Sequence, residues 1–377
     1  MTSIPAPVIA LFLGNLEMGG AERVFVTLSH QFVQRGYQVR MILAHKAGPL
    51  LNELDPAIEI VDLQAARPEP PAWLFALRTL LALRRHLSDN PPHVLLSTLT
   101  GANLMAIIAR PLSGRAFRLV IREAVTLSNT RSRLRLQAMR WLYPHSDKII
   151  VLTGTMKKQL SSVLKLPSSQ MEVIGNPLSV ERITQQLEDQ AEQLRSQQHA
   201  PFWLAVGRLV AQKDFNTLIE AAALLRDRNT PIRLVILGDG PLRQQLQDRI
   251  YQLHLEDRVV LGGFTANPYP WFAKASGYVL TSRWEGYPNA LLEALYFNLP
   301  IVATHYDDSV SELLENRYRS RHRLVPVGNS ASLADAIHSL ACPSPLETKT
   351  SAPPCAAMGL ANSIADLYLA QLFPAQS

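Results

Sequence analysis

The sequence predicts an α/β protein made of two Rossmann-like, doubly wound domains. Its 377 residues are more than one core organises easily and suggest two domains of about 150 to 200 residues each. Short apolar runs of strand length alternate with helix-spaced segments, which is typical of parallel sheets covered by helices on both faces. This alternation stops once, in a polar, Gln-rich stretch at residues 184–199, and then starts again.

The first series begins with an apolar run at residues 8–13, followed by a glycine-containing turn and a helical pattern over 21–35. Residues 39–44 form the next strand, so the segment predicts a βαβ unit with a right-handed crossover. Further strands are expected at four places, residues 58–63, 94–97, 118–122 and 148–152.

The second series has the same character. Strands are expected at residues 202–207, 233–237, 259–261, 277–281 and 300–303. We therefore expect an N-terminal domain over 1–180, a helical linker over 181–200 and a C-terminal domain over 201–358. A Pro- and Ser-rich loop at 342–354 precedes a final helical pattern at 361–372.

Composition indicates a globular protein, with 47% apolar and 18% charged residues. The N-terminus lacks the basic region of a signal peptide, and no apolar stretch reaches the ~18 residues of a membrane span. Two cysteines, Cys342 and Cys355, show no zinc-binding spacing and are expected to be free thiols in a reducing compartment. These features predict a cytoplasmic protein.

Positive charge is concentrated in the first domain. Residues 1–178 carry 20 Lys and Arg against 11 Asp and Glu, whereas residues 179–377 carry 17 against 20. The densest part holds Arg110, Arg115, Arg118, Arg122, Arg131, Arg133, Arg135 and Arg140, with Glu123 as its one acid. Such a stretch is either a solvated helix face or a surface for anionic lipid head groups or phosphorylated acceptors. Nucleic acid is disfavoured, because no aromatic platform accompanies the arginines.

Residues 73–86 form an amphipathic helical pattern with basic side chains. A plain crossover helix is the favoured interpretation, and contact with a membrane surface is the alternative.

The most informative segment is residues 282–295, SRWEGYPNALLEAL. Pro288 suits the first position of a helix, so Glu293 is expected about one turn inside the helix and Glu285 in the loop before it. The amides around Gly286 to Ala290 and the helix dipole then make an anion site flanked by two carboxylates. The alternative without a binding function is an ordinary amphipathic helix with two solvated glutamates.

The spacing of the two glutamates, with Gly-Tyr-Pro-Asn-Ala between them, resembles the signature of retaining glycosyltransferase family 4 (glycosyl transferases group 1). The resemblance implies a GT-B fold, in which two Rossmann-like domains face a cleft and the C-terminal helix at 359–377 packs back on the first domain. It also implies that Glu285 contacts the transferred sugar and Glu293 the nucleotide ribose. Gly286, Tyr287, Asn289 and Ala290 are then expected around the donor.

Two cations follow the first strand of the second domain, in VGRLVAQKDF at residues 206–215. In the family the matching residues neutralise the donor diphosphate, so Arg208 and Lys213 are expected to stabilise the leaving group. Surface loop charges are the alternative. Gly238 lies in a glycine turn after a strand and is expected at the nucleotide pocket. Phe264 is expected there too, because its segment resembles the one that contacts the base in the family.

The turn containing Gly19 and Gly20 leads from a strand into a helix, where backbone can approach a phosphate or sugar closely. It lacks the G-x-G-x-x-G order of dinucleotide-binding proteins. The sequence GGAER resembles the loop that faces the donor in the same family, although a turn needed only for packing remains an alternative.

The sequence departs from the family in two places. Residues 305–310, HYDDSV, replace a small, Gly-bearing turn. Glu123 occupies the position where many relatives carry a histidine, so it is either a contact to an acceptor or sugar hydroxyl or a partner in a structural salt bridge. No metal is expected, because Asp307 and Asp308 are adjacent and diverge while Arg208 and Lys213 already supply positive charge.

The family resemblance, together with these features, implies a retaining, metal-independent hexosyltransferase that needs no cofactor. It would move a hexose from a nucleoside diphosphate sugar to a cell-envelope glycan or lipid-linked acceptor, at the inner face of the plasma membrane. The alternatives are a nucleotide-sugar epimerase, a phosphorylase, or a non-catalytic sugar-nucleotide-binding partner in polysaccharide assembly.

Overall fold

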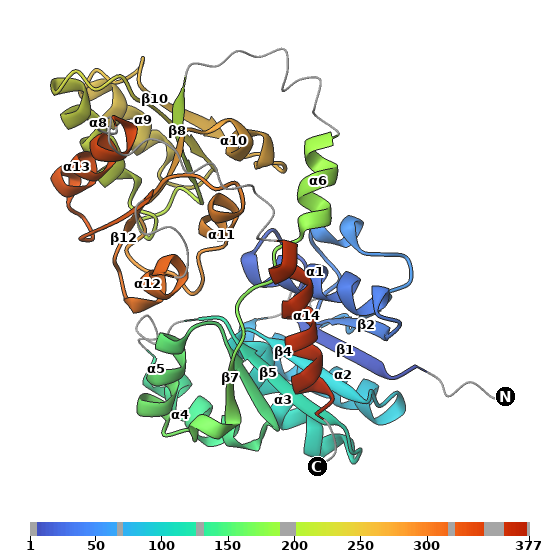
Figure 1. The fold of residues 1–377 in the computed structure, drawn as a ribbon. Helices are drawn as coiled ribbons and strands as arrows, with labels where there is room; N and C mark the ends of the chain where they lie inside the picture. The colour runs from blue at the N-terminus through green and yellow to red at the C-terminus, as the bar shows by residue number, and fades with distance from the viewer. Residues whose placement is uncertain are drawn as a thin grey trace. The chain divides into compact units, whose positions relative to one another are not determined.

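A computed structural model describes residues 6–65, 71–125, 132–188, 201–315, 321–342 and 358–374 of the chain. The chain forms two compact units (Figure 1). Unit 1 contains Met1–Leu178 together with Gly359–Ser377, and unit 2 contains Ser179–Met358. The chain therefore builds most of unit 1, then unit 2, and returns to unit 1 with its last helix.

Unit 1 is organised around a seven-stranded parallel sheet in the order β3-β2-β1-β4-β5-β6-β7. Its central strands are almost wholly buried, as expected for a parallel sheet with helices on both faces. The strands are β1 (Val8–Leu13), β2 (Gln38–Leu43), β3 (Glu59–Asp62), β4 (Val94–Thr98), β5 (Arg118–Glu123), β6 (Lys148–Val151) and β7 (Met171–Val173).

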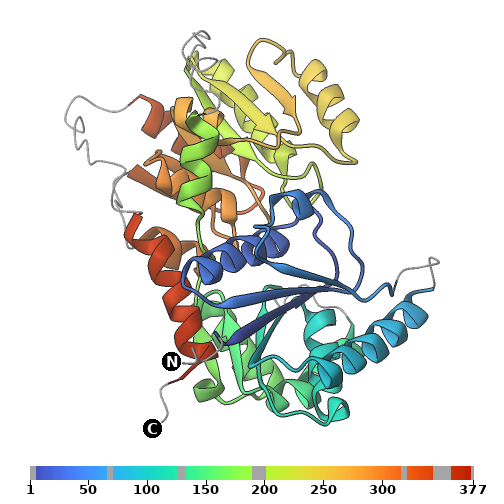
Figure 2. The same ribbon diagram turned by 90° about the vertical axis from the view of Figure 1, so that its right-hand side faces the viewer.

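Helices cover both faces of this sheet. On one face α1 (Gly20–Gln34) and α14 (Met358–Leu372) share a hydrophobic core with alternate residues of the strands. On the other face lie four helices that contact one another in chain order (Figures 1 and 2). These are α2 (Ala72–Asp89), α3 (Thr100–Ser113), α4 (Arg133–Leu142) and α5 (Gly154–Leu164).

The C-terminal helix α14 is joined to unit 1 by packing and by polar contacts. Figures 1 and 2 show it, in red, beside the strands of unit 1. Ala365, Tyr368 and Leu372 are fully buried in the unit 1 core. Asp366 pairs with Arg35 at 2.7 Å. Helix α14 is therefore an integral part of unit 1.

Unit 2 contains a six-stranded parallel sheet in the order β10-β9-β8-β11-β12-β13. The first helix of the unit, α6 (Val180–Glu188), contacts α10 (Tyr269–Lys274), and Asn267 donates a 2.9 Å hydrogen bond to the carbonyl of Gln186. The strands are β8 (Phe202–Val206), β9 (Arg233–Leu237), β10 (Val259–Gly263), β11 (Gly277–Leu280), β12 (Ile301–Thr304) and β13 (His322–Val325). The remaining helices are α8 (Phe215–Asp227), α9 (Arg243–Gln252), α10 (Tyr269–Lys274), α11 (Asn289–Tyr296), α12 (Asp308–Glu315) and α13 (Ser330–Ala341).

The prediction of two Rossmann-like, doubly wound domains is confirmed. In each sheet the strand order reverses beside the first strand, between β1 and β4 in unit 1 and between β8 and β11 in unit 2. Ligands of open α/β sheets bind outside the carboxyl ends of the strands at such switch points. Of the predicted linker, residues 181–188 belong to α6, and residues 189–200 lie outside the described residues, as do Cys355 and the loop residues 343–357.

Candidate functional site

The predicted cations and the signature segment of unit 2 meet at its switch point. Two loops follow β8 and β11, and three hydrogen bonds to backbone carbonyls are among those that join them. Thr281 Oγ1 donates to the carbonyl of Lys213 (2.6 Å), Arg283 N to the carbonyl of Gln212 (2.8 Å), and Gln212 Nε2 to the carbonyl of Trp284 (2.7 Å). The loops thus form one connected structure at the carboxyl ends of the strands.

Lys213 and Glu285, which are 72 residues apart, form a direct ion pair. The Glu285 carboxylate also accepts hydrogen bonds from Ser282 Oγ (2.6 Å) and Gln212 Nε2 (3.2 Å). The Glu285 side chain is only 8% exposed, whereas that of Lys213 is 20% exposed. The sequence placed both residues in the site but did not anticipate their pairing or the roles of Ser282 and Gln212. Ser282 lies three residues before Glu285, and a search for local hydroxyl donors would have found it.

Two glycines allow this arrangement. A Cβ at Gly207 would lie 2.9 Å from Cε of Lys213, so the lysine stem passes directly over that glycine. Gly238 has φ +137° and packs its backbone against Gly207, where any Cβ would overlap with the Gly207 carbonyl oxygen. Gly238 therefore has a demonstrable packing role in the turn that was predicted to border the nucleotide pocket.

Arg208 and Phe264 are exposed on unit 2. Arg208 follows β8 at the switch point, and it forms no ion pair with any other described residue. Phe264 follows the edge strand β10, and its side chain is 62% exposed. An exposed aromatic ring at the carboxyl end of a strand offers a flat apolar surface for stacking.

The signature segment forms the predicted loop and helix. Helix α11 begins at Asn289, so Pro288 is the residue before the helix and its carbonyl accepts from Leu291 N at 3.0 Å. The start is one residue later than expected, since Pro288 has ψ 83° and is not helical. Glu293 lies one turn inside and is half-buried, while Gly286 and Tyr287 are half-buried in the loop.

Both glutamates act electrostatically on one buried side chain. Burial raises the pKa of Tyr278 well above its usual value of 10.0, and the negative charges of Glu285 and Glu293 raise it further. The Tyr278 hydroxyl is buried and has no hydrogen-bond partner among the described residues. Two carboxylates eight positions apart thus both lie close enough to Tyr278 to act on its hydroxyl.

In unit 1 the predicted contact residue Glu123 lies in the interior. It is the last residue of β5, is fully buried, and accepts hydrogen bonds from Tyr143 Oη, from Thr100 Oγ1 (3.1 Å) and from the amides of Ala124 and Val125 (3.1 and 3.0 Å). These donors occupy the oxygens that a sugar hydroxyl would use. The geometry therefore favours a structural role, with tyrosine and threonine partners in place of the expected arginine.

The pH dependence of stability tests this placement. Burial raises the pKa of Glu123 above its usual 4.5. The folded state therefore holds this proton more tightly than the unfolded state, so the contribution to stability is present at low pH and is lost as pH rises through the folded pKa. Glu123→Gln cannot titrate. The free energy of unfolding of the wild type, minus that of the variant, should fall above pH 4.5 by up to about 1.4 kcal/mol per pH unit.

Urea denaturation of both proteins from acidic to neutral pH measures this difference. Glu256→Gln, at an exposed position of unit 2, is the control and should follow the wild type. Parallel stability curves for wild type and Glu123→Gln would show that the pKa of Glu123 is not raised in the folded protein.

Arg122, beside Glu123, is also fully buried. Its guanidinium donates to Tyr368 Oη of α14 (3.1 Å), to Thr98 Oγ1 (2.8 Å) and to Asn176 Oδ1. The predicted arginine surface is therefore smaller than its sequence suggested, because Arg122 belongs to the core. Arg110 is paired with Asp147, an acid outside the stretch considered. Arg131 lies outside the described residues.

The glycine turn of unit 1 is occupied by the protein's own carboxylate. Glu22, in the first turn of α1, folds back so that a Cβ at Gly19 would overlap with its oxygens. Burial raises the pKa of Glu22, and its contacts with backbone amides and the charge of Arg122 act in the opposite direction. Gly19 thus makes room for Glu22, and Gly20 begins the helix. Sequence reasoning overlooked Glu22, although it lies within the GGAER motif.

Asp307 and Asp308 have different partners. Asp307 accepts from Ser309 N at 2.9 Å, and Asp308 lies 3.7 Å from His305 Nε2. Within the described residues, no group of three or more His, Cys, Asp or Glu side chains has the arrangement of a metal site. In the same part of the chain no helix is both long and apolar enough to span a membrane.

Comparison with known proteins relates both units to one family. The family model Glycosyltransferase Family 4 matches residues 18–182, and the model Glycosyl transferases group 1 matches residues 186–350. The chain is 32% identical over 318 residues to an N-acetylgalactosamine-N,N'-diacetylbacillosaminyl-diphospho-undecaprenol 4-alpha-N-acetylgalactosaminyltransferase of Campylobacter jejuni, covering 81% of this chain and 82% of the relative.

A second protein of Campylobacter jejuni, a GalNAc-alpha-(1->4)-GalNAc-alpha-(1->3)-diNAcBac-PP-undecaprenol alpha-1,4-N-acetyl-D-galactosaminyltransferase, is 26% identical, with 82% of each chain covered. Among solved structures, HepE from Anabaena in complex with UDP matches with a TM-score of 0.71 and 18% identity over 97% of this chain and 95% of that one. The lipopolysaccharide outer core galactosyltransferase WaaB matches with a TM-score of 0.70 and 17% identity over 97% and 99%. At these identities the two structures support the fold.

Proposed function

The chain belongs to glycosyltransferase family 4, the glycosyl transferases group 1, and we propose that this glycosyltransferase moves a hexose from a nucleoside diphosphate sugar with retention at the anomeric carbon. The observation that carries the proposal is the Lys213–Glu285 pair at the β8/β11 switch point, beside the start of α11. A cation, a carboxylate and a helix N-terminus at one strand edge match the diphosphate and the sugar of such a donor.

The donor diphosphate is assigned to Arg208 and Lys213. Negative charge on the diphosphate increases as the sugar leaves, so cations held at that position stabilise the transition state more than the bound donor. Arg208 is exposed and Lys213 keeps a fifth of its side chain accessible, so both can meet a ligand. With the α11 dipole they supply positive charge at the diphosphate, and we propose a metal-independent reaction without a cofactor.

The remaining parts of the donor are assigned to the two glutamates and to Phe264. Glu285 receives hydroxyls of the transferred sugar, Glu293 receives the ribose hydroxyls, and the exposed ring of Phe264 borders the base. Gly286 to Ala290 surround the diphosphate. Lys213 and Ser282 both contact Oε1 of Glu285, whereas Oε2 accepts, among the described residues, only from Gln212 Nε2 at 3.2 Å. Oε2 can therefore accept a sugar hydroxyl, while the bonds that hold the carboxylate leave it poorly placed to attack the sugar.

Retention then follows from attack on the face that the leaving group occupies. The bond from the anomeric carbon to the diphosphate oxygen breaks, and the acceptor oxygen forms the new bond on the same side. The acceptor proton passes to the departing diphosphate, whose charge Arg208 and Lys213 hold. This reaction needs no nucleophilic side chain of the enzyme.

The acceptor is proposed to be a cell-envelope glycan or a lipid-linked glycan. The names of the two Campylobacter relatives describe transfer to undecaprenyl-diphosphate-linked sugars. The outward-facing arginines of the 110–140 stretch support contact with an anionic membrane surface, which would place the protein at the cytoplasmic face of a membrane.

A thermal-shift panel of nucleoside diphosphate sugars tests the donor assignment. A true donor at 100 times its dissociation constant should stabilise the protein by about 2.7 kcal/mol. Glu293→Ala should bind that donor about tenfold to hundredfold more weakly, because it loses hydrogen bonds to a charged group. The exposed Glu256→Ala is the matched control.

Product analysis separates the alternatives. Slow release of free nucleoside diphosphate from the stabilising donor supports a transferase. An isomerised donor would identify an epimerase, and binding without turnover in the presence of membrane-derived acceptors would identify a non-catalytic partner. Equal donor affinity of wild type and Glu293→Ala would contradict the ribose assignment.

A further inference from the structure

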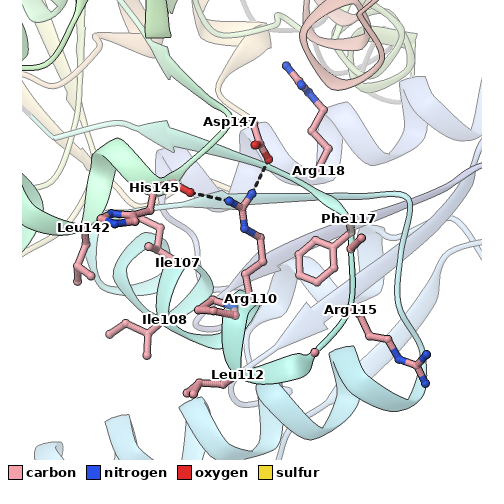
Figure 3. Close-up of a pocket in the computed structure, with 13 residues that line it drawn as sticks. Ile107, Ile108, Arg110, Leu112, Arg115, Phe117, Arg118, Leu142, His145 and Asp147 are labelled. Atoms are coloured by element: carbon pink, nitrogen blue, oxygen red, sulfur yellow. Dashed lines mark hydrogen bonds and ion pairs between the residues drawn. The ribbon is translucent and has the colours of Figure 1, made fainter.

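Unit 1 has a surface pocket of about 1150 Å³ far from its switch point. It lies between the C-terminal end of α3, the start of β5 and the end of α4 (Figure 3). Arg118 and Asp147 stand at the amino ends of β5 and β6, whereas Glu123 marks the carboxyl end of β5. A six-residue strand is about 20 Å long, so the pocket is distinct from any site at the carboxyl edge.

The lining of the pocket is mainly apolar. Ile107, Ile108, Leu112, Phe117 and Leu142 contribute side chains to it, and Leu112 is 51% exposed. In Figure 3 the Phe117 ring lies between the side chains of Arg115 and Arg118, and Arg110 points to Asp147. Since Arg110 is neutralised by Asp147 and also donates to the carbonyl of His145 (2.8 Å), it adds little net charge.

Positive charge lies on the rim beside Leu112. Arg84 Nε donates to the carbonyl of Leu112 (3.0 Å), and Arg115 Nε donates to the carbonyl of Ser88 (3.0 Å). Both arginines are exposed. Each guanidinium has five N–H donors, so these bonds hold the two cations in place and leave capacity for an anion.

Helix α4 extends the same surface. Leu134 and Trp141 are 80% and 75% exposed, and they are seven residues apart, which puts them on one side of the helix. Arg133 and Arg140 form a parallel row next to them. Exposed Leu and Trp side chains flanked by arginines are typical of helices that lie in a membrane interface, with the charged heads reaching the phosphates.

The direction of α4 relates this surface to the carboxyl edge. The helix follows β5 in the chain and leads into β6, which is parallel to β5. It therefore runs back along the sheet, so that Arg133 is nearer the carboxyl edge and Leu142 reaches the pocket. A membrane parallel to α4 would contact the pocket at one end and approach the carboxyl edge at the other.

We propose that this pocket binds one anionic phospholipid of the membrane that carries the acceptor. The phosphate pairs with Arg84 and Arg115, and the acyl chain lies on Leu112, Ile108 and Phe117. Charge complementarity and the exposed apolar row of α4 support this occupant. The inference rests on the proposed lipid-linked acceptor, because only a membrane-borne substrate requires this docking.

Sedimentation with lipid vesicles tests the inference without donor or acceptor. The wild type should bind vesicles that contain phosphatidylglycerol much more tightly than vesicles of phosphatidylcholine alone. Arg115→Glu should reduce binding to the anionic vesicles about thirtyfold, since it removes one positive charge and adds a negative one. Ala116→Trp, at an exposed lining position, should fill the pocket and remove the preference without altering any charge.

Arg233→Glu, at an exposed arginine of unit 2, is the matched control and should bind like the wild type, and thermal unfolding checks that each variant is folded. Binding by Ala116→Trp equal to or stronger than that of the wild type would overturn the pocket assignment. Self-association that Ala116→Trp abolishes would do so too, by identifying a second copy as the occupant. Lipid binding without any transferase activity would contradict the proposed function alone.

Discussion

Replacing Lys213 by alanine is expected to lower kcat by about 10²- to 10³-fold, the effect of losing one group that stabilises developing negative charge. Donor affinity should change less, because the charge on the diphosphate is greatest after the sugar begins to leave. Initial rates over a range of donor concentrations, with the donor found by thermal shift, separate kcat from KM. Unchanged transfer by Lys213→Ala would rule out its assignment to the leaving group.

The ion pair makes a second measurement necessary. Lys213→Ala leaves Glu285, whose side chain is 8% exposed, without its cation, and an unpaired buried charge destabilises a protein. The variant Lys213→Ala/Glu285→Gln removes that charge and should recover stability without recovering kcat. Lys274→Ala, at another half-buried lysine of unit 2, is the control and should leave kcat unchanged. Recovery of kcat in the double variant would show that the loss came from misfolding of the loop.

Gly238→Ala is expected to destabilise unit 2 by about 3 kcal/mol or more, measured as the free energy of unfolding in urea. At φ +137° a side chain costs about 1 to 3 kcal/mol, and the new Cβ would also overlap with the carbonyl oxygen of Gly207. The loop that carries Arg208 and Lys213 must then move, so donor affinity should fall as well.

Gly328→Ala separates these two causes. Gly328 has φ +72°, but a Cβ there meets no atom within 4 Å. This variant should lose only about 1 kcal/mol of stability from backbone strain and keep its donor affinity. Equal destabilisation by both substitutions would show that the contact between Gly238 and Gly207 contributes nothing.

The fold and the loop-and-helix geometry at the unit 2 switch point followed from local patterns. Apolar runs such as residues 8–13 and 202–206 become buried parallel strands because their composition suits a sheet covered on both faces. The signature loop and helix formed one residue from the expected position, since a proline before a helix and the spacing of two glutamates are local features. The roles of individual residues at this site are proposals, which the variants described above test.

The structure differed from the prediction where the role of a residue depends on partners that are distant in the sequence. The sequence predicts Arg122 as part of a basic surface stretch, and Glu123 as a contact to an acceptor or sugar hydroxyl or a partner in a salt bridge. Both residues are fully buried. Their partners Tyr143, Asn176 and Tyr368 are separated from them by 20 to 246 residues. No local pattern reveals which distant hydroxyls and amides will satisfy a buried charge.

By itself, the sequence determined the doubly wound architecture, the family and the segments that border the unit 2 switch point, because periodicity and motif spacing are properties of neighbouring residues. Tertiary structure alone decided that Lys213 pairs with Glu285, that Glu22 fills the glycine turn, and that Arg110 is neutralised while Arg84 and Arg115 remain at the rim of a pocket. The charged residues can be counted from the sequence. Whether each charge can meet a ligand depends on burial and pairing, which arise only when strands and helices distant in the chain come together.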